Sequence, residues 1–260
     1  MPRQLLVLSG GHPYEAEPFA ALLASLGGWT VTHLLHPEAE RLVGEGCADE
    51  ADAILFYDMP GYTFADGQVL ARPPSEAVRR AILDRFAAGR GAVAMHHALA
   101  GWAEWPEWSE LLGGRFLYQP GEVRGRAQPD SGYRHDVAYV AEVAADHPVT
   151  AGLPASFAMS DELYLAPVFD DEIVPLIRAR YDFVRDNFYS AAAAVAGEMF
   201  SNEGWTHPPG SDCVAWVRQA GNAPLVYLQF GDGPAAYANP HVRRALANAL
   251  GFVAAHRLAN

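Results

Sequence analysis

The first 115 residues alternate short apolar runs with segments that have helical periodicity. Four apolar runs, QLLVLSGG, TVTHLL, ADAILFYDMPG and GAVAM, begin at residues 4, 30, 51 and 91. Continuous apolar runs of this length are typical of strands buried on both faces of a parallel sheet. Helices are expected between them over 18–26, 38–43 and 75–89, the last capped by Ser75 and ended by Gly89. This alternation predicts an α/β fold with a doubly wound, mostly parallel central sheet.

The second half of the chain is less regular but continues the same kind of fold. Residues 133–144 alternate like a half-exposed strand, and 172–179 form another strand-like run. Residues 223–231 predict a buried strand, and 240–255 a closing helix. Because no internal repeat or linker-like segment separates the two halves, we expect a single domain over 1–260.

Two stretches look like additions to a minimal sandwich. Residues 119–132 form a long polar loop, and 182–212 contain several aromatic residues and the helix-prone run SAAAAVAGEMF at 190–200. Long segments in a compact domain are often lids or binding loops. We therefore expect one of these insert-like segments to cover a ligand or to form a subunit interface. A subunit interface would make the protein a homo-oligomer. The alternative is that the segments are irregular surface loops.

Composition excludes several classes of partner. The formal net charge is −13, and an acidic chain repels phosphate backbones, so we expect no nucleic-acid partner. No apolar stretch approaches the roughly 18 residues of a membrane span, and the N-terminal apolar run is too short for a signal peptide. Cys47 and Cys213 have neither a metal-type nor a disulfide-type spacing. These features favour free thiols and a cytoplasmic location.

Polar residues follow the ends of the predicted parallel strands. His12 follows the first strand, Asp58 the third, the pair His96 and His97 the fourth, and Asp232 the last. Ligands of open parallel sheets bind beyond the carboxyl ends of the strands, so we expect these side chains to meet there. A histidine at such a corner can transfer a proton, bind a metal or hydrogen-bond a hydroxyl group.

A second group of polar residues lies in the segment SDELYLAP. It contributes Asp161, Glu162 and Tyr164. A cap or turn role for Asp161 and a core position for Tyr164 are the alternatives to ligand binding.

Five segments in order resemble the ThuA-like (trehalose utilisation) family. They are GRGAVAMHHAL, WPEWSELLGGRF, DHPVTAGLP, SDELY and FGDGPAAYANPHVRRALANALGFVA, and their order and spacing match from about residue 3 to 254. The resemblance implies a class I glutamine amidotransferase-like fold, which is a flavodoxin-like three-layer sandwich. It also implies a role in sugar or disaccharide metabolism.

The resemblance does not extend to glutaminase chemistry. Related glutaminases carry a cysteine nucleophile where this chain has His96, and no G-x-S-x-G or G-x-C-x-G pattern occurs. We therefore expect an enzyme that acts on a sugar derivative by acid–base chemistry, with His96 and Glu162 as the catalytic pair; isomerisation, elimination and hydrolysis all remain open. The alternative is a non-catalytic metabolite-binding or regulatory module.

We expect the remaining candidates to bind the substrate. Hydroxyl groups would be held by residues from both halves of the chain, and Trp102 would stack on a sugar ring. The full set of expected substrate-binding residues is His12, Asp58, His97, Trp102, Asp161, Tyr164 and Asp232.

A divalent metal such as zinc is a further possibility for the same edge. Zinc accepts imidazole nitrogen and carboxylate oxygen, but no H-E-x-x-H or H-x-H spacing occurs. Members of the resembling family often have a Gly-His pair where this chain has Gly231-Asp232, which would replace a nitrogen ligand by an oxygen ligand or remove the metal. The candidate ligands are His12, His96, His97, His135 and Glu162.

Overall fold

The computed structural model describes residues 2–256 and is built around one ten-stranded sheet. Its central part is parallel, with the strand order β14-β6-β3-β1-β2. Burial explains this position, because every residue of β3, β6 and β14 is buried. The bounds of the five strands are β1 Arg3–Gly10, β2 Trp29–Leu35, β3 Ala53–Asp58, β6 Ala92–Met95 and β14 Ala223–Leu228.

The second half of the chain extends this sheet with antiparallel strands. A hairpin joins β13 to β14, and β11, β9 and β10 follow in that order, with β12 pairing the other end of β9. Their alternating buried and exposed residues suit strands that have one solvated face. The bounds are β9 Gly132–Val143, β10 Ser156–Leu165, β11 Ile173–Arg180, β12 Tyr189–Ser190 and β13 Cys213–Ala220.

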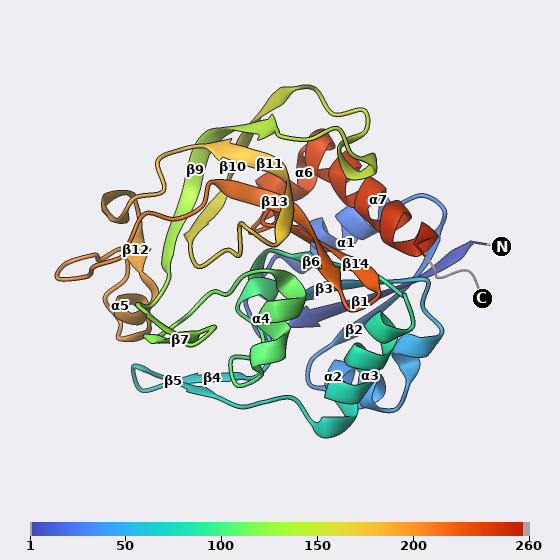
Figure 1. Cartoon of the computed structure of the whole chain (residues 1–260), viewed down its shortest axis with the longest axis horizontal. Helices are drawn as coiled ribbons and strands as arrows, with labels where there is room; N and C mark the ends of the chain where they lie inside the picture. Colours follow the sequence, from blue (N-terminus) through green and yellow to red (C-terminus); the bar gives the residue numbers. More distant parts are fainter. Residues whose placement is uncertain (1, 257–260) are drawn as a thin grey trace.

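Helices cover both faces of the parallel part and complete three layers (Figure 1). One face packs against α1 (Ala16–Ala24), α6 (Pro234–Ala238) and α7 (Pro240–Ala255), and the other against α2 (Glu38–Gly44), α3 (Glu76–Ala87) and α4 (Pro106–Leu112). The expected flavodoxin-like α/β sandwich with its parallel central sheet is thereby confirmed.

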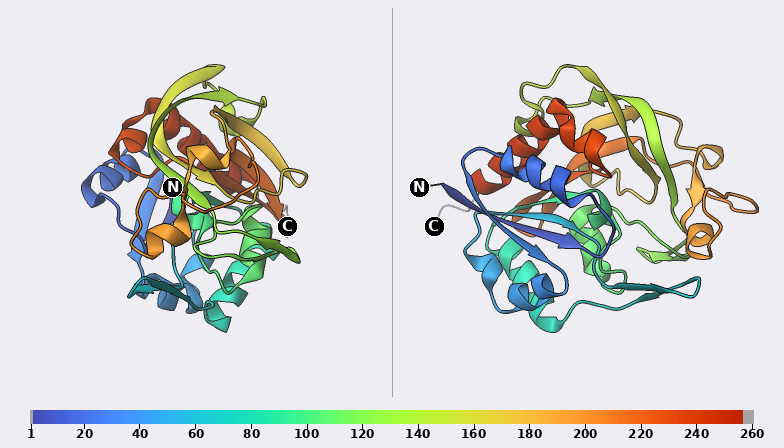
Figure 2. Two further views of the ribbon diagram at one scale, coloured as in Figure 1. Left: turned by 90° about the vertical axis from the view of Figure 1, so that its left-hand side faces the viewer. Right: turned by 180° about the vertical axis from the view of Figure 1, so that it is seen from behind.

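Smaller elements project from this core. They are the hairpins β4 (Tyr62–Ala65) with β5 (Gln68–Ala71) and β7 (Gly121–Val123) with β8 (Arg126–Gln128), the helix α5 (Ala191–Val195), and the 3-10 turns η1 Cys47–Asp49, η2 His96–Leu99, η3 Pro148–Thr150 and η4 Arg185–Asn187. In Figure 2, the β4–β5 hairpin and the α5 region extend away from the end of the molecule where the N-terminus lies. No helix within residues 2–256 is both long enough and apolar enough to cross a membrane.

Two of the expected helices differ from the observed ones in their bounds. The first helix begins at Ala16 rather than at residue 18, because Pro18 fits within the first turn, where its missing N–H is not required. The run at 190–200 is helical only over Ala191–Val195, since Gly197 turns the chain with a φ of 92°. The helix 240–255 agrees with α7, and Ser75 caps α3 by accepting a hydrogen bond from the Val78 amide.

Candidate active site at the carboxyl edge of the sheet

His96 is the first residue after β6, at the corner between the strand and η2. Its φ is +46°, an uncommon left-handed backbone conformation outside glycine, and its side chain is 0% exposed. Nδ1 lies 2.5 Å from the Gln229 carbonyl oxygen, so Nδ1–H donates and Nε2 faces the other way. The hydroxyl of Tyr227 donates to the His96 carbonyl oxygen at 2.9 Å. The turn and the ring are therefore both fixed by the end of the neighbouring β14.

A β-bulge brings Glu162 and His135 together. Val137 pairs Asp161 and Arg134 pairs Leu163, so that His135 and Asp136 of β9 both lie opposite Glu162 of β10. Bulges re-aim side chains and recur beside active sites. Here His135 Nδ1 lies 3.2 Å from Glu162 Oε1, and His96 Nε2 lies 3.0 Å from Glu162 Oε2. Glu162 thus has one imidazole at each carboxylate oxygen.

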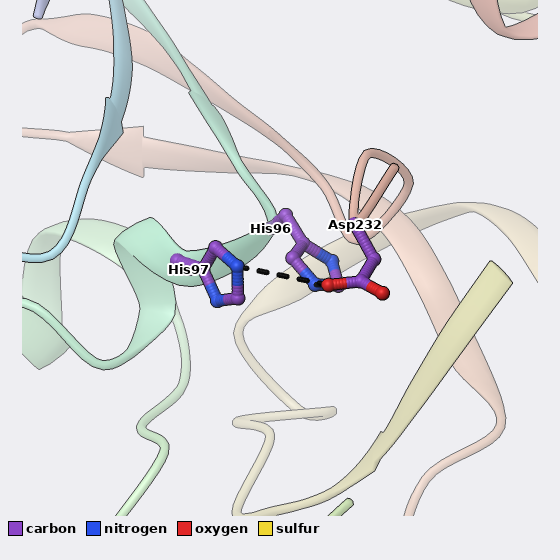
Figure 3. Close-up of side chains that lie close together, drawn as sticks. All are labelled: His96, His97 and Asp232. Atoms are coloured by element: carbon purple, nitrogen blue, oxygen red, sulfur yellow. Dashed lines mark ion pairs between the residues drawn. The ribbon is translucent and has the colours of Figure 1, made fainter. Parts of the chain in front are cut away.

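Asp161 holds the loop that carries Asp232. Its carboxylate accepts hydrogen bonds from the amides of Gly231 at 2.8 Å and Asp232 at 3.1 Å. The Asp232 carboxylate then lies between imidazoles, with Oδ1 3.5 Å from His96 Nε2 and Oδ2 3.7 Å from His135 Nδ1. Figure 3 shows Asp232 and the two imidazoles at the end of β6 pointing toward one another, with His97 Nε2 3.8 Å from Asp232 Oδ1.

Tyr164 and His12 complete the polar cluster. The Tyr164 hydroxyl lies 2.8 Å from His96 Nε2 and 3.0 Å from His97 Nδ1. The His12 and His97 rings are in contact, with centroids 3.9 Å apart. His12 Nε2 lies 3.0 Å from the Tyr57 carbonyl oxygen, which fixes this ring against β3.

The two carboxylates make His96 a cation. Burial alone disfavours an imidazolium, but contacts with Asp232 and Glu162 outweigh it and raise the pKa of His96 well above its ordinary value. Burial likewise opposes the charge on Asp232, yet His135 and His96 hold the pKa of Asp232 below its usual range. The contact with Asp232 also raises the pKa of His135.

The neighbouring histidines, His97 and His12, are neutral. Burial, reinforced by His96, lowers the pKa of His97 well below its ordinary value, and burial also lowers the pKa of His12. A neutral His97 can accept the Tyr164 hydroxyl proton at Nδ1, which leaves the Tyr164 oxygen free to face the Nε2–H of His96. Burial raises the pKa of Asp161 to about 6, although two amides donate to it.

A cavity of about 490 Å³ opens onto this cluster. Six polar residues line it: His12, His97, His135, Glu162, Tyr164 and Asp232. Its remaining lining is formed by Gly11, Pro13, Met59, Phe64, Phe116, Tyr118, Tyr133, Ala191, Ala194, Val195 and Met199. The second insert-like segment, 182–212, thus contributes to the cavity through α5 and Met199, whereas residues 119–125 line a separate cavity of about 410 Å³ beside α4.

Four of the residues expected at the site do not line the cavity. His96 lies behind Glu162, Tyr164 and Asp232, and Asp161 is occupied by the two loop amides. Asp58 is buried, and its Oδ2 lies 2.7 Å from His36 Nε2. His96 and Asp161 therefore contact the residues that line the cavity but do not line it themselves.

Trp102 is the fourth of these residues. It is 2% exposed, packs against Gly61, and has the Arg72 guanidinium over its ring. Its backbone, with a φ of +50°, and the hydrogen bond from its amide to the Pro60 carbonyl direct the side chain into the core between the sheet and α4. The expected stacking of Trp102 on a sugar ring is not supported by this placement.

Sequence reasoning missed the aromatic part of the cavity. Phe64, Phe116, Tyr118 and Tyr133 line it, but they come from a hairpin, a loop and an antiparallel strand with no distinctive local pattern. Gln229, whose carbonyl oxygen fixes the orientation of the His96 ring, was also missed, because a carbonyl contact leaves no trace in residue type.

Among residues 2–256, two groups of side chains could hold a divalent cation. His96, His97 and Asp232 form one, and His135, Glu162 and Asp232 the other, with the donor atoms of each group within 4.8 Å of one another. Asp232 belongs to both groups. Nitrogen and carboxylate donors suit zinc, and the hydrogen bond from His96 Nδ1 to a carbonyl is a usual support for a metal-bound imidazole. His12, the remaining candidate, belongs to neither group.

Comparison with known proteins places the fold. The model of the trehalose-utilisation (ThuA) family matches residues 5–253. A ThuA-like protein from Parabacteroides merdae superposes with a TM-score of 0.68 and 16% identity, covering 100% of this chain and 93% of its own. A ThuA-like protein from Bacteroides uniformis superposes with a TM-score of 0.63 and 18% identity, covering 96% of this chain and 91% of its own. A cytoplasmic protein from Salmonella typhimurium superposes with a TM-score of 0.58 and 12% identity, covering 96% of this chain and 99% of its own. No curated protein sequence matches the chain.

Proposed function

The chain belongs to the trehalose-utilisation (ThuA) family, which supports a role in sugar metabolism, and we propose that it is an enzyme that transfers protons on a sugar derivative. The observation that carries this proposal is the Glu162–His135 pair, a carboxylate and an imidazole 3.2 Å apart that both line the cavity. General acid–base catalysis needs two such groups within reach of one substrate.

The two groups are suited to opposite roles in proton transfer. His135 is partly exposed, and its raised pKa provides a proton for a substrate oxygen. Glu162 accepts at Oε2 from the buried His96 imidazolium, which fixes the carboxylate with Oε1 toward His135. His96 is therefore a positioning residue, and Glu162 is the base.

The step that fits these roles is proton transfer at a carbon next to a carbonyl group. Glu162 takes the proton from that carbon, the electron pair forms a carbon–carbon double bond, and His135 gives a proton to the carbonyl oxygen. Where the first carbon bears a hydroxyl group, return of a proton to the former carbonyl carbon, with loss of the hydroxyl proton to form the new carbonyl group, completes an isomerisation. Loss of a substituent from the next carbon, with return of the enol proton and re-formation of the carbonyl group, completes an elimination. Hydrolysis would need the same two groups to activate water.

Covalent catalysis by lysine or cysteine has no support in the lining of this cavity. The 260 residues contain no lysine, so no Schiff base can form on a lysine of this chain. Cys47 lies in η1 and Cys213 in β13, and neither lines the cavity. The groups that do line the cavity, Glu162 and His135, support proton transfer instead.

Exchange of substrate hydrogen with solvent tests the proposal. The protein would be incubated with keto derivatives of glucose and of trehalose in deuterium oxide, and deuterium on carbon measured by NMR and mass spectrometry. We expect carbon-bound deuterium with the native protein and a loss of about 100-fold or more for Glu162→Gln, which keeps the shape of the carboxylate but not its basicity. Glu142→Gln, on the neighbouring β9 and outside the cavity, is the matched control.

A sugar that binds without hydrogen exchange and without turnover would overturn the proposal that the protein is an enzyme, and would favour a metabolite-binding module. Full activity of Glu162→Gln would overturn the role of Glu162.

We also propose a cytoplasmic location, which is supported by the description of the Salmonella typhimurium neighbour as a cytoplasmic protein.

A further inference from the structure

The cavity has an aromatic wall that leads from its mouth to the polar cluster. We use this name for Phe64, Tyr118, Phe116 and Tyr164, all of which line the cavity. Neighbouring rings are in contact, with centroid distances of 5.1 Å from Phe64 to Tyr118, 5.1 Å from Tyr118 to Phe116 and 4.8 Å from Phe116 to Tyr164. Tyr164 reaches His96, so the wall is continuous from the β4–β5 hairpin to the proposed catalytic groups.

The mouth of the cavity is apolar on a second side. Ala194 and Val195 of α5 and the following Met199 line it. Phe64 is 45% exposed and Met199 is 50% exposed, which is a large apolar area to leave in water beside a polar site. The turn of the β4–β5 hairpin lies against the end of α5. A Cβ added at Gly67 would be 3.7 Å from the Cα of Ala196.

Asp130 fixes the α5 region in place. Its buried carboxylate accepts hydrogen bonds from the Ser190 hydroxyl at 2.6 Å, the Ala192 amide at 2.9 Å and the Trp205 indole at 3.0 Å. The apolar side of the mouth is therefore preformed, and a ligand does not have to order it.

The charge of the cavity lining argues against anionic ligands. Phosphate and carboxylate groups are usually held by arginine or lysine. No arginine lines this cavity among the described residues, the chain has no lysine, and the carboxylates of Glu162 and Asp232 are both present. A sugar phosphate or sugar acid would meet these carboxylates, and the imidazolium of His135 in the lining is already paired with both of them.

From these features we infer that the cavity takes an uncharged glycoside whose aglycone is flat and apolar. The sugar lies on the polar cluster, and the aglycone lies along the aromatic wall toward Phe64 and Met199. The inference rests on the proposed function for the sugar end of the ligand, and adds the substrate class. It predicts that the apolar group, and not a second sugar or a phosphate, provides most of the affinity beyond the first ring.

Calorimetric binding of matched glycosides tests this substrate class. The probes are the phenyl and methyl glycosides of glucose, galactose and mannose in both anomeric forms, together with glucose 6-phosphate. We expect at least one phenyl glycoside to bind about tenfold or more tightly than its methyl counterpart, and glucose 6-phosphate not to bind measurably. Equal affinity of every phenyl and methyl pair, tightest binding of the phosphate, or no binding of any glycoside would overturn the inference.

Variants at the mouth of the cavity test where the aglycone lies. Phe64→Ala and Met199→Ala both change exposed side chains, so the fold should persist, and each should reduce the phenyl-to-methyl affinity ratio at least threefold with little change for the methyl glycoside. Leu70→Ala is the matched control, because Leu70 belongs to the same hairpin and is exposed but does not line the cavity. A ratio unchanged by both mouth variants would contradict the assigned position of the aglycone.

The two proposals fail in different ways. Glu162→Gln should lose hydrogen exchange while it keeps the phenyl-to-methyl ratio. A preserved ratio without exchange in the native protein would overturn the catalytic proposal alone. Exchange on a simple keto sugar with no preference for a phenyl group would overturn only the substrate class.

Discussion

Glu162 Oε2 lies 3.0 Å from Nε2 of His96, a residue 66 positions earlier in the chain that directly follows β6. Strand β6 is parallel and central, whereas β10, which carries Glu162, is an antiparallel edge strand. The ion pair therefore connects the core of the sandwich to the part of the sheet that the second half of the chain adds. The stability of this connection should depend on pH.

His96 and His97 should have opposite effects on the pH dependence of folding. The folded pKa of His96 is raised, so its stabilisation is complete below about pH 6.5 and is lost as the pH rises through the higher folded pKa. The folded pKa of His97 is lowered, so its stabilisation is present above about pH 6.5 and is lost as the pH falls. Urea unfolding from about pH 5 to 9 should show a flatter alkaline limb for His96→Gln and a flatter acid limb for His97→Gln. Curves parallel to that of the native protein for both variants would contradict these protonation states.

The β-bulge should tolerate glycine but not a branched residue at Asp136. Its φ of +54° is left-handed, and such a conformation costs a residue with a Cβ about 1–2 kcal/mol. Asp136→Gly should leave the free energy of unfolding unchanged or raise it by up to about 1 kcal/mol, whereas Asp136→Val should lower it by about 1–2 kcal/mol. Asp171→Gly and Asp171→Val, at an exposed position without a positive φ, are the controls. Equal effects at both positions would show that the bulge conformation is not maintained in solution.

Removal of the Asp130 carboxylate should loosen the α5 region. Asp130→Ala leaves the buried Trp205 indole N–H and the Ala192 amide without their acceptor, and each unsatisfied buried donor costs about 1–3 kcal/mol. We expect the free energy of unfolding to fall by at least about 2 kcal/mol and amide hydrogen exchange to increase over residues 189–205. Asp171→Ala should change neither measurement. A silent Asp130→Ala variant would mean that the carboxylate does not hold this segment.

Both thiols should be dispensable for activity. Cys213 is buried in β13, where burial raises its pKa to about 12, and burial also raises the pKa of Cys47, so neither is a ready thiolate at neutral pH. The double variant Cys47→Ala, Cys213→Ala should retain hydrogen exchange on sugar substrates, and neither form should release ammonia from glutamine. Loss of exchange in a double variant whose circular dichroism matches the native protein would contradict this prediction.

Much of the fold could be predicted because its signals are local. The apolar runs that became β1, β3 and β6 and the capped helix α3 each depend on a few consecutive residues, and their order along the chain implies a parallel sheet with helices on both faces. The same rule placed His96 and His97 at the edge where the cavity opens, because parallel strands end on one side.

The roles of the site residues were decided by tertiary structure. Asp161 and Glu162 are adjacent carboxylates that the sequence does not distinguish. In the structure Asp161 holds the Gly231–Asp232 loop and Glu162 faces the cavity, because successive side chains of β10 point to opposite faces of the sheet. Trp102 was expected at the ligand and is in the core, while Phe64 from an exposed hairpin lines the cavity. Periodicity within a strand or helix is set by near neighbours and can be read from the sequence. Which side chains meet across the sheet depends on strand pairing over more than 60 residues, and this is fixed only when the whole core packs.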